Sequence, residues 1–205
     1  MRKWIVAAVV VLLAAGGGAA FLRSRAGEDT QRPATFRAER TTAHYEPIAT
    51  RAADPDPLTV EEIFPTGSVS AGGTTLASQG SEELTDCASA VWGTAREAVA
   101  GCTQALRARY ATGDGQVLGQ FVIFNLADSA AADRLVDALG HNGFVRPAAP
   151  DGFQGSAGWA QARALGHYVT VSWVTPALNA GKVDLTFPQV AVDSPSLLVQ
   201  HRLVR

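Results

Sequence analysis

The stretch Leu106–Phe124, LRARYATGDGQVLGQFVIF, decides the fold class expected for this 205-residue chain. In its first part, Leu106, Ala108 and Tyr110 alternate with two arginines, which is typical of a β-strand with one solvent-facing side. The second part ends in four consecutive apolar residues, as expected of a central strand covered on both faces. The Gly-Asp-Gly sequence at 113–115 supplies the turn between them. We therefore predict a hairpin within a sheet.

The segments that follow extend this hairpin into an α+β domain. Asp128 has the character of an N-cap, and Gly140 that of a C-cap, for a helix with one apolar stripe. The stripe consists of Ala131, Leu135, Ala138 and Leu139. Trp159–Leu165 and His167–Thr175 form a second predicted hairpin. From Asp184 to Arg205 the signal is mixed, and Leu197, Leu198, Leu203 and Val204 suggest a short apolar element. One use for such an element would be to cover the second face of the sheet.

Before the first hairpin, the sequence has a helical period, which indicates a helix, and a pair of cysteines, which could form a disulfide only if that helix is interrupted. The residues that recur at helical steps of four and three are Leu84, Ala88, Val91, Ala95 and Ala98. Cys87 and Cys102 lie fifteen residues apart, so an unbroken helix would separate them by about 22 Å. A disulfide needs Cα atoms within about 7 Å. Either the helix breaks at Gly93 and the two cysteines pair, which we favour, or they do not pair with each other.

The predicted order from residue 74 is strand, helix, strand, strand, helix, strand, strand. This order is close to the split β-α-β-β-α-β, or ferredoxin-like, arrangement, a small antiparallel sheet with two helices on one face. The domain is expected to span residues 57–205. Thr59 and Glu62 form a capping box for a short helix at its beginning.

Ahead of the domain, Trp4–Leu22 contains nineteen residues without a charge. As a helix it would rise about 28 Å, which matches the hydrocarbon core of a bilayer and predicts a transmembrane anchor. Cleavage after Ala19 or Ala20 would instead make the segment a signal peptide and the protein secreted. Residues 23–56 are rich in Thr, Ala, Arg and Pro, and we expect them to form a flexible linker.

Two observations disagree about the orientation in the membrane. The region after the apolar segment is at least as basic as the region before it, which by the positive-inside rule favours a cytoplasmic domain. The cysteine pair favours an oxidising compartment, and a short basic start before an apolar run is the form of an export signal. We predict a single-pass cell-membrane protein with an extracytoplasmic C-terminal domain.

Several motifs support the same prediction by resemblance. Pro57–Pro65 (PLTVEEIFP), a cysteine, Gly101–Tyr110 (GCTQALRARY) and the Gly-Asp-Gly turn resemble uncharacterised membrane-anchored proteins of high-GC Gram-positive bacteria. The resemblance covers about residues 57–175. It implies an anchored extracytoplasmic α+β domain with a cysteine pair, and it implies no catalytic residue.

Charge and motif content exclude several classes of function. The net charge is −2, and the basic residues among the first 25 contribute +4, so the rest of the chain sums to −6. Such an acidic domain is a poor nucleic-acid binder. The four histidines have no metal-ligand spacing, and the chain contains neither a phosphate loop nor a dinucleotide fingerprint. We therefore predict no metal and no cofactor.

The remaining candidate is a polar face of the sheet. The residues that would share such a face are Arg107, Arg109, Gln161, Arg163, Tyr168, Thr170 and Ser172. Arginines among hydroxyls suit an anionic envelope polymer, a lipid head group or a partner protein, although they would equally keep a solvated face soluble. Our candidate binding residues are Arg107, Arg109, Arg163 and Tyr168.

Taken together, these features favour a non-enzymatic binding or regulatory domain of the cell envelope. The alternative is a secreted or anchored hydrolase whose serine, histidine and carboxylate come together only in the folded chain.

Overall fold

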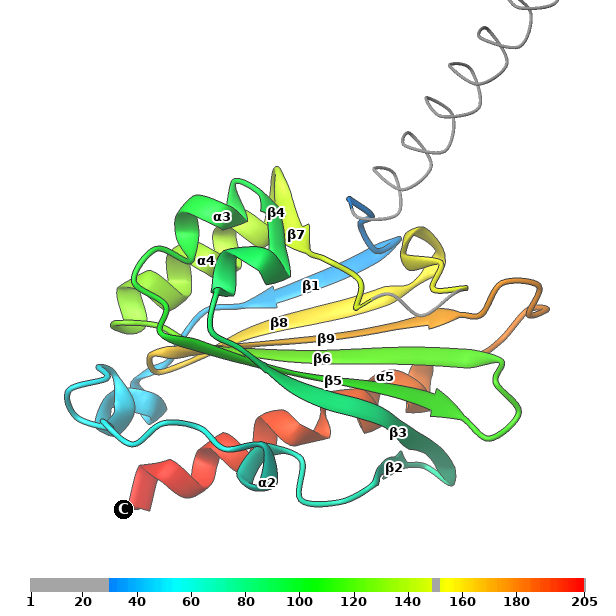
Figure 1. Cartoon of the computed structure of the whole chain (residues 1–205), viewed down its shortest axis with the longest axis horizontal. Helices are drawn as coiled ribbons and strands as arrows, with labels where there is room; N and C mark the ends of the chain where they lie inside the picture. The colour runs from blue at the N-terminus through cyan, green and yellow to red at the C-terminus, as the bar shows by residue number, and fades with distance from the viewer. Residues whose placement is uncertain (1–29, 149–151, 205) are drawn as a thin grey trace, which may run out of the picture.

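The computed structural model describes residues 30–148 and 152–204, and a curled seven-stranded sheet dominates them (Figure 1). The strand order is β1-β8-β9-β6-β5-β3-β2, in which β1 is parallel to β8 and the other neighbours are antiparallel. The strands of this sheet are β1 (Thr35–Glu39), β2 (Ser68–Ala71), β3 (Thr74–Leu84), β5 (Gln104–Thr112), β6 (Val117–Asn125), β8 (Trp159–Leu165) and β9 (Tyr168–Pro176). β4 (Val91–Gly93) and β7 (Gly143–Val145) form a separate antiparallel ribbon.

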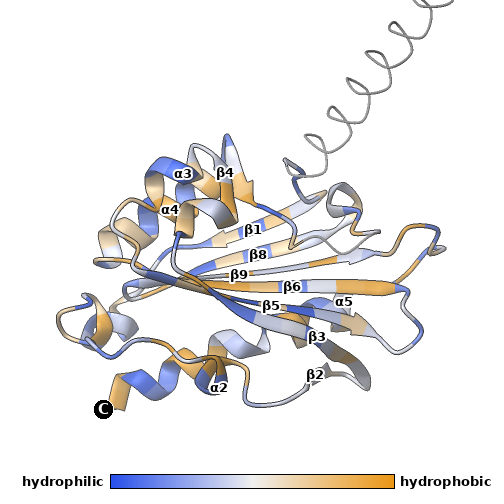
Figure 2. Ribbon diagram, viewed as in Figure 1, coloured by the Kyte–Doolittle hydropathy of each residue, from blue (hydrophilic) through white to orange (hydrophobic). Residues whose placement is uncertain are grey.

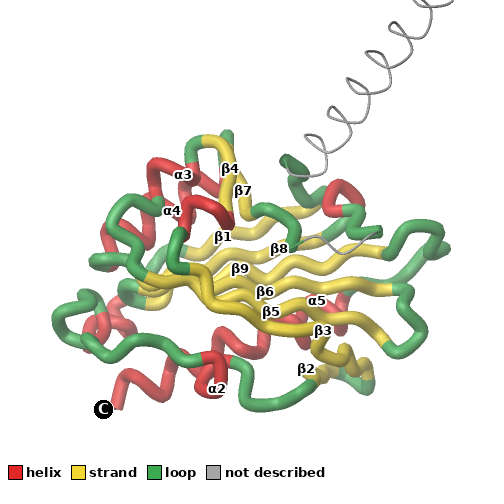
Figure 3. The backbone as a smooth tube through the Cα atoms, viewed as in Figure 1, coloured by secondary structure: helices red, strands yellow, loops and turns green. Residues whose placement is uncertain are grey.

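Helical segments cover both faces of the sheet (Figures 1 and 3). On one face lie α3 (Ala95–Ala98), α4 (Ser129–Gly140) and the β4–β7 ribbon. On the other lie α5 (Thr186–Asp193), the 3-10 segment η4 (Ser194–Val204) and the short helix α2 (Val60–Ile63). The remaining 3-10 turns are η1 (Ala43–Ile48), η2 (Cys87–Ala90) and η3 (Gly155–Ala157). We call the two faces the α4 side and the α5 side.

The central strand β6 contributes side chains to the apolar cores on both faces of the sheet. Val122 and Phe124 belong to the apolar cluster on the α4 side, while Phe121 and Ile123 belong to the cluster on the α5 side. All four are fully buried, and the apolar character of β6 stands out in Figure 2. This alternation confirms the prediction of a central strand that is covered on both faces.

The locally coded elements form as predicted. The β5–β6 and β8–β9 hairpins and helix α4 are all present. Asp128 caps α4 by accepting a hydrogen bond from the backbone N–H of Ala131 at 2.7 Å. Thr59 caps α2 in the same way, accepting from the N–H of Glu62 at 3.1 Å. The apolar C-terminal element also covers the second face, as η4 together with α5.

The disulfide is confirmed, but the helix proposed around it does not form. Cys87 and Cys102 are bonded, with their Cα atoms 6.2 Å apart. We favoured a helix broken at Gly93, and the chain does change direction there, with Gly93 in the left-handed region at φ +63°. On either side of Gly93, however, the chain forms η2, β4 and the four-residue α3 in place of two helical halves. A side chain at Gly93 would overlap the carbonyl group of Asn142. The apolar residues of the helical period are instead distributed over four elements, the end of β3 and the short η2, β4 and α3.

The small two-helix ferredoxin-like fold predicted for the domain is therefore wrong. The sheet has seven strands rather than four or five, and β1 makes it mixed. The cause is the number of short elements that carry little periodic signal: β1 and β2 have only five and four residues. Each gains its stability from pairing with a longer neighbour rather than from its own pattern.

Residues 23–56 were expected to form a flexible linker, but the segment 35–48 within them is structured. It includes β1 and η1. Phe36 of β1 packs edge-on against Phe144 at 5.2 Å between ring centroids, and Ile48 is buried in the α5-side core. The predicted anchor, Trp4–Leu22, lies outside the described residues. Within residues 30–148 and 152–204, none of the helices has the length and apolar character needed to cross a membrane.

Candidate functional site

The predicted binding residues do not share one face of the sheet. Arg107 lies opposite Val122 in the β5–β6 register, and Val122 belongs to the α4-side core. Arg163 lies opposite Thr170, which in turn lies opposite Ile123 of the α5-side core. Since neighbouring strands keep paired residues on the same face, the two arginines are on opposite sides of the sheet.

Arg107 and Arg109 remain together on the α4 side, near the β3 edge. Arg107 is paired with Glu82, at 3.0 Å from Nε and 2.8 Å from Nη2 to the same carboxylate oxygen. Its side chain is 15% exposed, whereas that of Glu82 is 48% exposed. Arg109 donates from Nη2 to the backbone carbonyl of Gln79 at 3.0 Å. The charge of Arg107 is thus already neutralised within the sheet, and Arg109 is held by a carbonyl group.

Arg163 and its neighbours on the α5 side are covered by α5. The guanidinium of Arg163 contacts Asp193 at 3.0 Å and Glu39 at 3.4 Å. Asp193 also accepts a hydrogen bond from the Ser172 hydroxyl at 2.9 Å, and Gln189 donates to that hydroxyl at 2.8 Å. Burial raises the pKa of Asp193 even though Arg163 acts in the opposite direction. This cluster links α5 to β8 and β9.

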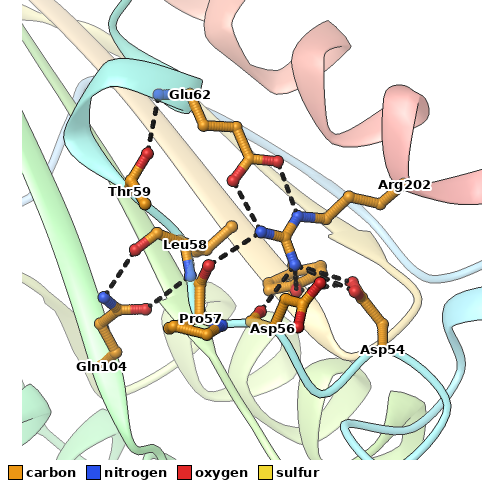
Figure 4. A network of polar contacts seen from close by, with 9 residues as sticks. Asp54, Asp56, Pro57, Leu58, Thr59, Glu62, Gln104 and Arg202 are labelled. Atoms are coloured by element: carbon orange, nitrogen blue, oxygen red, sulfur yellow. Dashed lines mark hydrogen bonds and ion pairs between the residues drawn. The ribbon is translucent and has the colours of Figure 1, made fainter. Parts of the chain in front are cut away.

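Tyr168 belongs to a third group, a buried network around Arg202 (Figure 4). Arg202 is 3% exposed, and its guanidinium forms two hydrogen bonds to each of two carboxylates. Its Nε and Nη2 donate to Glu62 at 2.9 and 2.6 Å, and its Nη1 donates to both oxygens of Asp54 at 3.0 and 3.2 Å. The Tyr168 hydroxyl accepts from Nη1 at 2.9 Å and donates to Asp54 at 2.7 Å.

Backbone groups complete the network. Nη1 of Arg202 donates to the carbonyl of Asp56 at 2.7 Å, and Nη2 donates to that of Pro57 at 3.0 Å. One step further along, the Gln104 side chain clamps the backbone of Leu58, accepting from its N–H at 3.0 Å and donating to its carbonyl at 2.8 Å. The network therefore fixes residues 54–58, which run between β5 and η4 (Figure 4).

Sequence reasoning missed the Arg202 network. Asp54 fell within the predicted linker, and Arg202 lay in a C-terminal region with a mixed signal. The one available indication was an arginine set among Leu198, Leu203 and Val204 in an apolar element, because a charge in such a position requires buried partners.

The described histidines form no catalytic arrangement with a nucleophile. His167 is fully buried, contacts the carbonyl of Ile48 through Nδ1 at 2.8 Å, and stacks on Tyr168. Its Nε2 atom is buried without a hydrogen-bond partner in the described part of the chain. Burial lowers the pKa of His167 and keeps the ring neutral. His141 contacts the backbone carbonyl of Asp137. Over residues 30–148 and 152–204, no group of histidine, cysteine and acidic side chains has the geometry of a metal site.

A cavity of about 310 Å³ lies on the α5 side, where α2 and β2 face η4. Its lining consists of Ile63, Phe64, Pro65, Thr66, Ser68, Val69, Ser70, Tyr110, Ser194, Pro195, Leu197 and Leu198. None of these residues is charged. A volume of this size with a mostly apolar lining and a few polar groups is typical of a small-molecule site. We call this cavity the α2–η4 groove.

Tyr110 is the most buried polar side chain of the groove. The residue is 2% exposed, and burial alone raises the pKa of its hydroxyl. No described residue forms a hydrogen bond with that hydroxyl, in contrast to Tyr168, which has two partners. The hydroxyl is not among the buried side-chain atoms that lack a partner in the described residues, so the ring of Tyr110 is buried while its oxygen reaches solvent.

No protein-family model, curated protein or solved structure matches this chain.

Proposed function

We propose that this chain is a membrane-anchored extracytoplasmic domain that binds an envelope component without transforming it. The observation that carries the proposal is the Cys87–Cys102 disulfide, since such bonds persist in oxidising compartments and are rare in the cytosol. The apolar segment Trp4–Leu22 supplies the anchor, with the basic residues Arg2 and Lys3 before it.

The position of the first described residues supports a short distance between the domain and the membrane. Eight residue steps separate Leu22 from Thr30, so the connecting chain spans at most about 28 Å. From Arg32 the chain is attached to the domain, because the Arg32 guanidinium donates to the carbonyl groups of Gly143 and Leu139. A domain held so closely would meet membrane components before any other partner.

The arrangement of polar groups favours binding over catalysis. The carboxylates of Asp54, Glu62 and Asp193 are each engaged with an arginine, and His167 is buried against a backbone carbonyl. Groups with these partners stabilise the fold and hold no proton ready for transfer. The α2–η4 groove, in contrast, is open to an uncharged ligand. It replaces the predicted arginine face as the binding site that we favour.

The proposal is tested by the accessibility of the two cysteines in intact cells that express the full chain. A membrane-impermeant maleimide should label them only after treatment with an impermeant reductant, and Cys87→Ser/Cys102→Ser should give the background. The chain should stay with the membrane after an alkaline wash, and a variant lacking residues 4–22 should not. Labelling only after lysis would place the domain in the cytosol, whereas labelling of intact cells without reductant would show that the two cysteines are not bonded. Either result would refute the proposal.

A further inference from the structure

Strand β1 is one of the two outer strands of the seven-stranded sheet, and its outer edge is free over the described residues. The backbone N–H of Thr35 donates to the carbonyl of Gly158 at 3.3 Å, where the parallel pairing with β8 begins. Successive residues of a strand point their backbone groups in opposite directions, so every second residue from Thr35 faces β8. The N–H and C=O groups of Phe36 and Ala38 therefore point outward, and no described residue bonds them.

β1 lacks the features with which sheet edges usually avoid pairing with another chain. It contains neither a proline nor a bulge, and its two charges are of opposite sign. The other side of the sheet differs, because β2 covers only the first part of β3. The uncovered part has a bulge between Ser78 and Ser81, followed by Glu82 and Glu83. Of these two strands, β1 is the one that can accept a further strand.

The sequence of β1 is complementary to itself in one antiparallel register. Antiparallel residues that exchange both backbone hydrogen bonds lie directly opposite, with Cα atoms about 5.5 Å apart. A twofold axis at Ala38 places this residue opposite Ala38 of a second copy, with the outward groups of both facing each other. It also places Arg37 opposite Glu39 of the second copy, and symmetry forms the same pair again. An axis at Arg37 would instead place two arginines opposite each other.

We propose that β1 pairs with β1 of a second copy of this chain, antiparallel about Ala38, so that two seven-stranded sheets join into one. The inference goes beyond the proposed function, because it names a protein partner rather than an envelope ligand. The side chain of Arg37 is 75% exposed and that of Glu39 is 34% exposed, so both are accessible to the second copy. Their contact within one copy, at 3.1 Å, is replaced or shared by the contact between copies.

The symmetry of this pairing agrees with the way in which the chain enters the domain. The twofold axis between two antiparallel strands is perpendicular to their sheet, so both copies turn their α4 sides in the same direction. Arg32 is bonded to the carbonyl groups of Leu139 and Gly143 on that side. Both chains therefore enter from one side, as two anchors in one membrane require. This agreement, unlike the pairing itself, rests on the proposed function.

The pairing is expected to be weak in dilute solution and favoured at a membrane. A strand of five residues pairs over less area than a standard protein–protein interface. Attachment to one surface raises the effective concentration of the two copies and offsets the small area. The test is therefore carried out on the full chain in phosphatidylcholine vesicles.

The experiment is cysteine cross-linking with copper phenanthroline as the oxidant and a non-reducing gel as the readout. Ala38→Cys should form a covalent dimer, because the two new side chains would face each other within reach of a disulfide. Ala53→Cys changes another exposed alanine, outside β1, and as the matched control should stay monomeric. Adding Arg37→Glu to Ala38→Cys should slow cross-linking about tenfold, because each Glu39 would then face a carboxylate.

A mixture of two charge variants separates loss of pairing from loss of folding. In the Ala38→Cys background, Glu39→Arg alone should slow cross-linking as Arg37→Glu does. The two variants mixed in the same vesicles should cross-link with each other, because every facing pair then has opposite charges again. Tags of different length on the two variants distinguish this mixed dimer on the gel.

The outcomes separate this inference from the proposed function. Cross-linking of Ala38→Cys no faster than that of Ala53→Cys would overturn the pairing. Equal rates with and without Arg37→Glu, or the absence of a mixed dimer, would also overturn it. Retention of the chain after an alkaline wash measures anchoring separately. A chain that cross-links at position 38 but washes off the vesicles would overturn the proposed function and leave the pairing in place.

Discussion

Replacement of Arg202 by methionine is expected to lower the free energy of unfolding by about 3–5 kcal/mol. Methionine keeps much of the apolar stem but removes the guanidinium that neutralises Asp54 and Glu62. Asp54 is only 7% exposed, so its carboxylate would remain in a poorly solvated position with Tyr168 as its remaining side-chain donor. Most of the expected loss is the cost of that unpaired buried charge rather than the strength of the original contacts.

The assay is denaturant unfolding of the full chain in a mild non-ionic detergent, followed by tryptophan fluorescence. Arg134→Met is the matched control, because Arg134 is exposed on α4, and it should change stability by less than about 0.5 kcal/mol. Arg202→Lys should fall between the two, since an ammonium keeps the charge but cannot form the paired contacts to both carboxylates. Adding Asp54→Asn to Arg202→Met should recover part of the loss. A loss below about 1 kcal/mol for Arg202→Met, or no recovery in the double variant, would refute the reasoning.

Three further changes test other parts of the fold. Cys87→Ala/Cys102→Ala should cost about 3 kcal/mol, as expected for a loop of this length, and reductant should then have no further effect on the melting temperature. Gly93→Ala should lower stability by more than 1 kcal/mol, because φ there is +63° and the new methyl group would meet a backbone carbonyl; wild-type stability would contradict this. For His167, a lowered folded-state pKa means that stability is complete above about pH 6.5 and is lost as the pH falls. Between pH 7.5 and 5 the melting temperature should therefore fall less for His167→Asn than for wild type, and equal falls would exclude this role. The control is His141→Asn at an exposed position, for which the melting temperature should fall as it does for wild type.

The parts of the fold that sequence predicted are those whose pattern is local. The alternation before the Gly-Asp-Gly turn and the apolar run after it identified β5 and β6, and Asp128 identified the start of α4. In each case the residues that set the conformation lie within one turn or one strand of each other. The Cys87–Cys102 bond was also favoured correctly, because geometry allowed it only if the chain broke near Gly93.

The parts that sequence did not predict depend on distant partners. β1 pairs with β8 across more than one hundred residues, and its five residues include only Phe36 as a large apolar side chain. The candidate groove likewise combines residues 63–70 with Tyr110 and residues 194–198. Tyr110 was predicted only as an apolar strand position. Its place in the lining of the groove follows from the surroundings that the fold gives it, which no spacing in the sequence encodes.

The Arg202 network and the α2–η4 groove are mechanically connected, because they share both of their supporting elements. Glu62, which binds Arg202, precedes the groove residues Ile63 and Phe64, and Arg202 follows Leu198 by four positions on η4. The ion pair therefore fixes the separation of the two groove walls, and that separation determines the width of ligand that fits. Glu62→Gln, which keeps the side-chain shape but weakens the pair, should lower the free energy of unfolding by less than Arg202→Met does, because Asp54 and Tyr168 still contact the guanidinium.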